Sequence, residues 1–407
     1  MKKCVLAFAA VLLGSCGSGD GGSSTVAVPP GTSGPTPTAS ATPATISGVT
    51  QSVAVATFDK PWAMAMLPDG RMLVSQRSAS GALWLVAADG TKKAVGGLPA
   101  SIGVLDVKLA PDYASTRQIF ITYMVEDRAA LRVGRAKDEP TLFPQRMEAA
   151  HAVLGNGTTG PELSNVVTFF RQDPTIVAFD GSGEPGGRMA FSPDGRYLFL
   201  TSGDRQELDA SFLFDLSNTL GKILRFNRDG SIPADNPFAA SATAKKEIWT
   251  IGHRNHYGLA FTRDGRLWSS EMGPKGGDEL NVIKPGLNYG WPAVSNGDNY
   301  VGPAIPDHAP GDGYEAPAIS WTPVIAPAGM IVCGGKLFGD WSGDILLTGL
   351  QSHGIVRVRP QGASASEVQR IDLGTRVRDI AEAPDGSLWI LTDGAAGELR
   401  RLSPVFG

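Results

Sequence analysis

The sequence predicts an all-β fold, a six-bladed β-propeller made of four-stranded antiparallel blades. Its 407 residues include 51 Gly and 29 Pro, and only 19% of them are charged. This composition favours many short strands and turns over long helices. A turn followed by a strand also recurs at long, irregular spacing, which is typical of propeller blades. Six such units occur, at residues 67–74, 110–123, 192–200, 262–268, 339–347 and 383–390.

Each unit is expected to belong to a blade of three or four short strands. Most of the turns contain Asp-Gly, in which glycine takes a positive φ at little cost. We expect residues 49–58 to close the ring against the last blade, and residues 130–166 and 295–317 to form loops on one face. A sandwich of two packed sheets is the structural alternative. Further apolar strands are expected at 63–66, 83–86, 189–191, 223–226, 355–358 and 399–402.

The N-terminus has the pattern of a targeting segment. Two lysines precede an apolar run at 5–13, which is too short to span a bilayer. The Leu-Gly-Ser-Cys sequence that follows resembles a bacterial lipoprotein signal cleaved before Cys16. We therefore expect residues 1–15 to be a signal peptide, and Cys16 to carry lipid that anchors the chain without spanning the membrane. An ordinary secretory signal cut nearby is the alternative.

Residues 16–47 are mostly Gly, Ser, Thr, Pro and Ala. Such a segment cannot bury enough apolar surface to fold, so we expect a flexible tether. The propeller is then expected to occupy residues 48–407. The net charge is −4 and there is no long basic run, which argues against binding to nucleic acid.

Polar residues gather around a predicted hairpin in the stretch 250–291. Arg254 and Asn255 precede its first strand, and five further residues follow its second strand. A guanidinium fork suits a planar polyanion, whereas carboxylates and free loop carbonyls suit a hard cation such as Ca²⁺. A solvated loop at the end of a sheet is the alternative interpretation. The five residues after the second strand are Glu271, Gly273, Pro274, Asp278 and Glu279.

The same stretch resembles a known family. It contains H-R-N-x-x-G-L-A-F at 253–261, S-E-x-G-P-x-G-G-D-E-L-N at 270–281 and N-Y-G-W at 288–291. These motifs are similar to those of the soluble quinoprotein glucose/sorbosone dehydrogenases, also called aldose sugar dehydrogenases. Further matches run from Pro61 to about Leu402. The resemblance implies that the C1 hydroxyl of an aldose is oxidised to a lactone with PQQ and Ca²⁺ as cofactors, and that an external acceptor takes the electrons.

The resemblance implies two groups of contacts to PQQ, which is a tricarboxylate. Arg254 and Asn255 match one pair of contact positions, and Arg376 and Arg378 match a second pair. Because alternate residues of a strand point to the same face, we expect the two pairs to converge on the central channel. Surface ion pairs are the alternative for Arg376 and Arg378. A further contact position, a lysine in the family, is Gln351 in this chain.

The resemblance also implies a calcium site. Gly273 and Pro274 match the positions whose backbone carbonyls hold the cofactor's Ca²⁺ in the family. That ion polarises a quinone carbonyl as a Lewis acid. Asp278 and Glu279 match positions near a further structural cation in some members. Hydrogen bonds that cap the loop are the alternative role for these two carboxylates.

Three positions depart from the family pattern. Glu184 stands where the family has its histidine base, and a carboxylate suits this role when burial raises its pKa. Ser101 replaces an active-site glutamine, and Gln351 replaces the lysine. His256 and His353 are candidates for a substitute base, because each follows a cofactor position by two residues.

The sequence leaves three functions open. The first is a PQQ-dependent dehydrogenase with a small sugar as substrate and an external electron acceptor as partner. The second is a propeller that has lost the usual base and binds an anionic ligand without oxidising a sugar. The third is a lactone hydrolase, since Ca²⁺ on a propeller axis also polarises a lactone carbonyl. Glu184 is the position on which the choice depends.

We predict that Cys16 becomes the lipidated first residue of a protein of the bacterial cell envelope that faces the periplasm, with a secreted form as the alternative. Gly17 follows it rather than aspartate, which by resemblance to bacterial lipoproteins indicates the outer membrane. A palmitate analogue is expected to label the wild type but not Cys16→Ala. Undiminished labelling of that variant contradicts the prediction.

Overall fold

The computed structural model describes residues 45–78, 81–178 and 183–407. The expected signal peptide, Cys16 and nearly all of the expected tether lie outside these ranges. Strands make up almost all of the described regular structure. The described helical segments are the short α1 (Tyr113–Thr116), α2 (Ala210–Leu213) and the 3₁₀ turn η1 (Gly339–Trp341). None of the described helices is long and apolar enough to cross a membrane.

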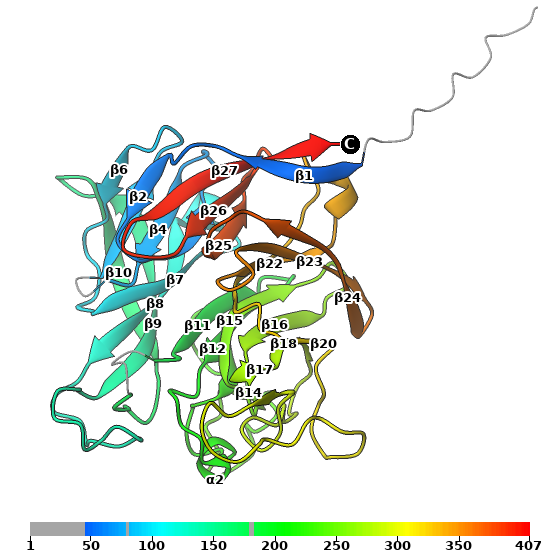
Figure 1. The fold of residues 1–407 in the computed structure, drawn as a ribbon. Coiled ribbons are helices and arrows are strands. Elements are labelled where there is room, and N and C mark those ends of the chain that lie inside the picture. The colour runs from blue at the N-terminus through cyan, green and yellow to red at the C-terminus, as the bar shows by residue number, and fades with distance from the viewer. Residues whose placement is uncertain (1–44, 79–80, 179–182) are drawn as a thin grey trace, which may run out of the picture. The chain divides into compact units, whose positions relative to one another are not determined.

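The strands form six antiparallel blades of four strands each (Figure 1). Going outwards from the axis, the first three blades are β3 (Pro61–Met66), β4 (Met72–Gln76), β5 (Ala82–Val86) and β6 (Lys92–Ala94); β7 (Gly103–Leu109), β8 (Gln118–Glu126), β9 (Gln145–Asn156) and β10 (Pro161–Arg171); and β11 (Gly186–Phe191), β12 (Tyr197–Ser202), β13 (Lys222–Asn227) and β14 (Ile248–Ile251). The fourth and fifth are β15 (Asn255–Phe261), β16 (Leu267–Met272), β18 (Asp278–Ile283) and β20 (Ile319–Trp321); and β21 (Pro327–Val332), β22 (Ile345–Gly349), β23 (Gly354–Gln361) and β24 (Ser364–Asp372). The sixth is β25 (Val377–Glu382), β26 (Leu388–Thr392), β27 (Gly397–Phe406) and β1 (Ile46–Gln51).

The first strand of each blade lies at the axis and packs against the first strands of both neighbouring blades. These contacts run in the order β3, β7, β11, β15, β21 and β25 and return to β3, so the ring is closed. Strands such as β4 and β22 are buried along their whole length, because a neighbouring blade covers each of their faces. The prediction of a six-bladed propeller is confirmed, and the two-sheet sandwich is wrong.

The two ends of the described chain close the ring together. β1 and the short strand β2 (Ala56–Phe58) both pair antiparallel with β27, the last strand of the chain. Residues 49–58 therefore contribute to closure as expected, and the pairing already begins at Ile46. Closure by chain ends makes the sixth blade depend on contacts between residues more than 300 positions apart.

One expected loop is wrong. Most of residues 130–166 belong to a long hairpin, β9 and β10, rather than to an unstructured insertion. β9 alternates buried and half-buried side chains along much of its length, and this period of two is that of a strand. Residues 295–317 are mostly irregular, as expected, apart from β19 (Gly297–Asp298), which pairs with β17 (Lys275–Gly276).

A buried arginine, Arg188 of β11, joins the inner strands of five blades. Its guanidinium forms ion pairs with Asp106 of β7 at 3.4 Å and with Asp379 of β25 at 3.0 Å. It also donates to the carbonyl of Tyr257 of β15 at 2.8 Å and lies over the ring of Trp62 of β3, 4.1 Å from its centroid. Burial alone would disfavour these charges, so their pairing at the axis is a requirement of the fold.

We predict that Arg188→Met lowers the free energy of unfolding by about 3–5 kcal/mol, because Asp106 and Asp379 are then left buried without their partner. Urea unfolding followed by circular dichroism measures the change. The matched control is Arg71→Met, which removes a surface ion pair with Asp69 and is expected to change the free energy by less than about 1 kcal/mol. Equal midpoints for Arg188→Met and the control contradict the prediction.

Candidate functional site

One end of the ring gathers the predicted site residues. In each blade the chain enters at the inner strand and then runs outwards, apart from the closing strand β1 of the sixth blade, so all six inner strands begin at the same end of the axis. The antiparallel pairing brings the connections between the second and third strands back to this end. We call this end the site face. It carries Glu184 just before β11, Arg254 just before β15, and Arg376 just before β25.

Two of the cavities at the site face border the predicted arginines. The first has a volume of about 460 Å³, and its lining includes Arg135, Glu184, Arg254 and Trp291. This volume lies within the range of about 300–1,000 Å³ that small-molecule sites occupy. The second has a volume of about 330 Å³ and lies next to Arg378. Its lining residues are Lys60, Pro61, Trp62, Arg77, Arg378, Asp393 and Gly394.

Arg254 is the best-anchored cation of the first cavity. Its guanidinium pairs with Glu184 at 2.6 Å and donates to the carbonyl oxygens of Met272 at 3.1 Å and Gly273 at 2.9 Å. It also lies over the ring of Trp291, 5.4 Å from the centroid. The Nε atom of Arg254 is buried, and no group of the described residues accepts its hydrogen. The guanidinium is thus fixed in place and retains one free donor.

Asp204 completes an acidic pair that the sequence did not indicate. It follows β12 and is fully buried, and the indole of Trp291 donates to its Oδ2 at 2.8 Å. Burial, and next the charge of Glu184, raise the pKa of Asp204 well above its ordinary value. Gly203 allows the close approach, because a Cβ at this position would lie 2.0 Å from the carbonyl oxygen of Glu184. The position of Asp204 at the end of a buried strand was the feature by which the sequence could have indicated it.

The backbone of Glu184 is held in a conformation that disfavours a side chain. Its φ is +51°, in the left-handed region, and Lys60 and Ala326 have φ values of +49° and +48° directly before two other inner strands. Non-glycine residues in this region cost about 1–3 kcal/mol each and concentrate at functional sites. Backbone strain of this kind therefore occurs at the site face in three blades.

Of the two residues whose carbonyls are expected to hold Ca²⁺, Pro274 lines the first cavity and Gly273 does not, and both carbonyls already accept hydrogen bonds. Gly273 accepts from Arg254, and Pro274 accepts from the hydroxyl of Tyr300 at 3.0 Å. Asp278 binds three backbone N–H groups, those of Gly273, Ile325 and Ala326, at 2.6–2.9 Å. Asp278 thus caps the loop, and as a metal ligand it would have to release these bonds.

The second arginine pair is held by a different carboxylate. Arg376 and Arg378 pair with the two oxygens of Asp393 at 2.9 and 2.8 Å. Both arginines therefore do share one face of the strand, and Arg378 lines the second cavity, whereas Arg254 lines the first. The structure brings the two pairs to one end of the ring, but Arg254 and Arg378 line separate cavities, and Asn255 and Arg376 line neither of them.

The remaining predicted site residues lie at the following positions. The side-chain oxygen of Asn255 accepts the backbone N–H of Gly186 at 3.4 Å and so ties β15 to β11. Gln351 lies on the connection after β22 with an exposed side chain, and His353 on the same connection is also exposed. Glu279 is buried, and it accepts from Asn281 at 3.1 Å.

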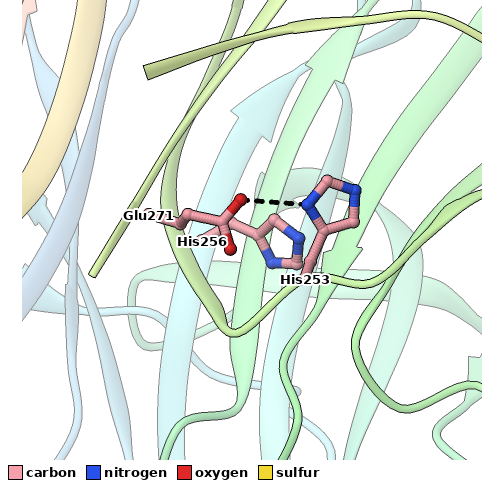
Figure 2. Close-up of side chains that lie close together, drawn as sticks. All are labelled: His253, His256 and Glu271. Atoms are coloured by element: carbon pink, nitrogen blue, oxygen red, sulfur yellow. Dashed lines mark hydrogen bonds and ion pairs between the residues drawn. The ribbon is translucent and has the colours of Figure 1, made fainter. Parts of the chain in front are cut away.

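The structure corrects the expectation that His256 is a substitute base. His256 lies in β15 with a fully buried side chain, and it lines neither cavity on the site face. Burial, together with the neighbouring His253, lowers its pKa to about 3, so the ring is neutral at physiological pH. Figure 2 shows it packed beside His253 and Glu271. A base must reach the proton that it removes, and this ring has no contact with a cavity that could hold a substrate.

Arginines and acidic side chains gather around cavities at one end of the propeller axis. This arrangement is typical of propellers with a small-molecule site at that end. Comparison with known proteins identifies the family. The family described as Glucose / Sorbosone dehydrogenase matches residues 58–401. The chain therefore belongs to the glucose/sorbosone dehydrogenase family.

Individual proteins resemble this chain in sequence and in structure. The chain is 35% identical over 362 residues to aldose sugar dehydrogenase YliI of Escherichia coli, covering 85% of this chain and 91% of the relative. It resembles the apo crystal structure of the soluble aldose sugar dehydrogenase of Escherichia coli with a TM-score of 0.76, 33% identity, and 88% and 100% coverage. It resembles the PQQ-bound aldose sugar dehydrogenase of Streptomyces coelicolor with a TM-score of 0.65, 28% identity, and 88% and 98% coverage.

We predict that Asp204 keeps its proton to a higher pH than an ordinary aspartate does. Infrared difference spectra between wild type and Asp204→Asn, recorded over a range of pH, are expected to show the carbonyl band of a protonated carboxylic acid above the usual titration range. In Glu184→Gln this band is expected to titrate at lower pH, because the neighbouring negative charge that raises the pKa is gone. A wild-type band that titrates where an ordinary aspartate does, or a titration that Glu184→Gln leaves unchanged, contradicts the prediction.

Proposed function

We propose that this protein is a PQQ- and Ca²⁺-dependent aldose dehydrogenase that oxidises the C1 hydroxyl of a sugar to a lactone and passes the electrons to an external acceptor. Membership of the glucose/sorbosone dehydrogenase family supports the reaction class. The observation that carries the proposal for this chain is the anchored guanidinium of Arg254 at the wall of a cavity of about 460 Å³.

The residues present fit an anionic, planar cofactor. Arg135 and Arg254 both line the first cavity, and the buried Nε of Arg254 lacks an acceptor among the described groups. A carboxylate is the acceptor that a guanidinium donor binds most strongly. Arg254, Asn255, Arg376 and Arg378 are the residues that we propose to hold PQQ, and the carbonyls of Gly273 and Pro274 are those that we propose to hold Ca²⁺.

PQQ, when bound with Ca²⁺, supplies the acceptor for the two electrons that leave the sugar. The chain must then supply a group that takes the hydroxyl proton. We assign this role to Glu184, because its carboxylate lines the cavity beside Arg254. Asp204 is assigned a supporting role, because it lies beside Glu184 and its raised pKa favours its protonated form.

Glu184 has an opposing effect on cofactor affinity. Its ion pair with Arg254 already neutralises the charge that would bind a cofactor carboxylate. A polyanion must therefore displace Glu184 from Arg254 or share the guanidinium with it. We expect PQQ to bind more weakly than in family members with histidine at this position, and sugar oxidation to be slow or atypical.

The test separates binding from turnover. Purified apoprotein is titrated with PQQ at several Ca²⁺ concentrations while cofactor absorbance is followed, and dye reduction is then measured with a panel of sugars. Saturable, Ca²⁺-dependent binding together with oxidation of at least one aldose is the expected result. If no PQQ binds at any Ca²⁺ concentration, the proposal fails, and the propeller that binds another anionic ligand or hydrolyses a lactone becomes the better description.

Variants of Glu184 sharpen this prediction. Glu184→Gln releases Arg254 and is expected to tighten PQQ binding about tenfold, which corresponds to about 1.4 kcal/mol. The same change removes the base, so turnover is expected to fall by about 10²–10⁴. Glu184→His is expected to raise turnover. Glu162→Gln, an exposed site on β10, is the matched control. A Glu184→Gln variant with unchanged affinity and unchanged turnover contradicts the assignment.

A further inference from the structure

A second polar cluster lies beneath the site face and away from both cavities there. His253, His256 and Glu271 come from the start of the fourth blade, with His256 and Glu271 opposite each other in the β15–β16 pair. All three side chains are buried, and one potential ligand atom from each lies within 4.8 Å of the others (Figure 2). This grouping takes no part in the role proposed for Arg254 and Glu184.

His256 is the anomaly in this cluster. Both ring nitrogens are buried, and neither has a hydrogen-bond partner among the described residues. Buried polar side-chain atoms are paired in the large majority of cases, so an imidazole with two unpaired nitrogens requires an explanation. Its ring lies 4.4 Å from that of His253, centroid to centroid. An atom that accepts electron pairs from both imidazoles would account for this arrangement.

The other two groups are oriented as metal ligands usually are. The Nε2 atom of His253 is 2.9 Å from the hydroxyl of Thr250, which leaves Nδ1 to face Glu271 at 3.0 Å. Glu271 is held by the side chain of Asn281 at 3.0 Å and by the backbone N–H of Arg254 at 2.8 Å. Outer hydrogen bonds of this kind fix the tautomer and direction of ligating side chains.

The polar surroundings also suit a cation. Glu271 and Glu279 are both buried, and the side-chain amide of Asn281 donates to Glu271 at 3.0 Å and to Glu279 at 3.1 Å. Two carboxyl groups thus share one amide, and a positive ion would offset negative charge that burial makes costly.

We propose that His253, His256 and Glu271 form a buried binding site for a divalent metal ion of the zinc class. Two imidazoles and one carboxylate suit Zn²⁺, whereas Ca²⁺ takes oxygen ligands only. A cavity of about 10 Å³, the space of one water, reaches Glu271. Four ligands at bonds of about 2.0–2.2 Å are typical of tetrahedral Zn²⁺. Because His253 and His256 flank Arg254 and Asn255, an ion bound to both histidines would restrain the backbone between them.

The test uses the purified protein without a histidine tag, stripped with a chelator and without PQQ, so that its outcome is independent of the proposed oxidation. Co²⁺ is titrated first, because its ligand-field absorption reports tetrahedral geometry, and Zn²⁺ is added next. One equivalent of bound Co²⁺ that Zn²⁺ displaces and excess Ca²⁺ does not, together with a Zn²⁺-dependent rise in Tm, is the expected result. Absence of stoichiometric binding overturns the proposal and leaves water as the partner of His256.

Two variants test the assignment of ligands. His256→Gln is expected to lose Co²⁺ binding and the Zn²⁺-dependent rise in Tm, whereas His151→Gln, on β9 of another blade, keeps both. If His256→Gln fails to fold, Thr250→Val removes only the hydrogen bond to His253 and is expected to weaken affinity by about 10–100-fold. Wild-type affinity in His256→Gln, or in Thr250→Val, overturns the proposal.

Discussion

The position of Arg188 at the axis is the constraint on which the rest of the structure depends. A propeller must bring the inner edges of its blades together, and here two of those edges carry carboxylates, Asp106 and Asp379, that no water reaches. One guanidinium compensates both charges and satisfies a backbone carbonyl of a third neighbour. Removing one partner from such an arrangement is far more costly than removing a surface ion pair. The fixed spacing of the inner strands in turn determines where their first residues lie.

The site face inherits its geometry from this closure. Glu184 lies four residues before Arg188 in the chain, and the segment between them is closely packed, because a Cβ at Gly186 or Gly187 would lie 2.7 or 2.9 Å from neighbouring atoms. The carbonyl of Glu184 also packs against Gly203, where a side chain would not fit. The carboxylate of Glu184 is therefore directed by backbone packing towards Arg254 and Asp204. A side chain whose backbone is packed in this way is positioned more accurately than one on a free loop, as the role proposed for Glu184 requires.

The blade count was predictable from sequence because a turn and the strand that follows it are local features. The position of Arg254 before its strand was predictable for the same reason. The charge partners were not, since Asp393 and Glu271 meet the arginines only through the register of paired strands, and Asp204 comes from another blade than Arg254. The orientation of His256 was also beyond the sequence, because whether a strand residue faces a cavity or a neighbouring blade depends on how the blades pack around the axis. Local sequence pattern thus predicts the strands and turns, whereas the pairing of charged side chains depends on how the strands and blades come together.

Arg254 connects the acidic pair of the third blade to the buried cluster of the fourth blade. Its backbone N–H donates to Glu271 in the buried cluster, while its side chain binds Glu184 in the cavity. The backbone bond restrains the segment without consuming any side-chain donor. The guanidinium can then exchange Glu184 for a ligand while the main chain beneath it stays in place. An anion-binding residue anchored in this way loses little conformational freedom on binding, which favours affinity through preorganisation.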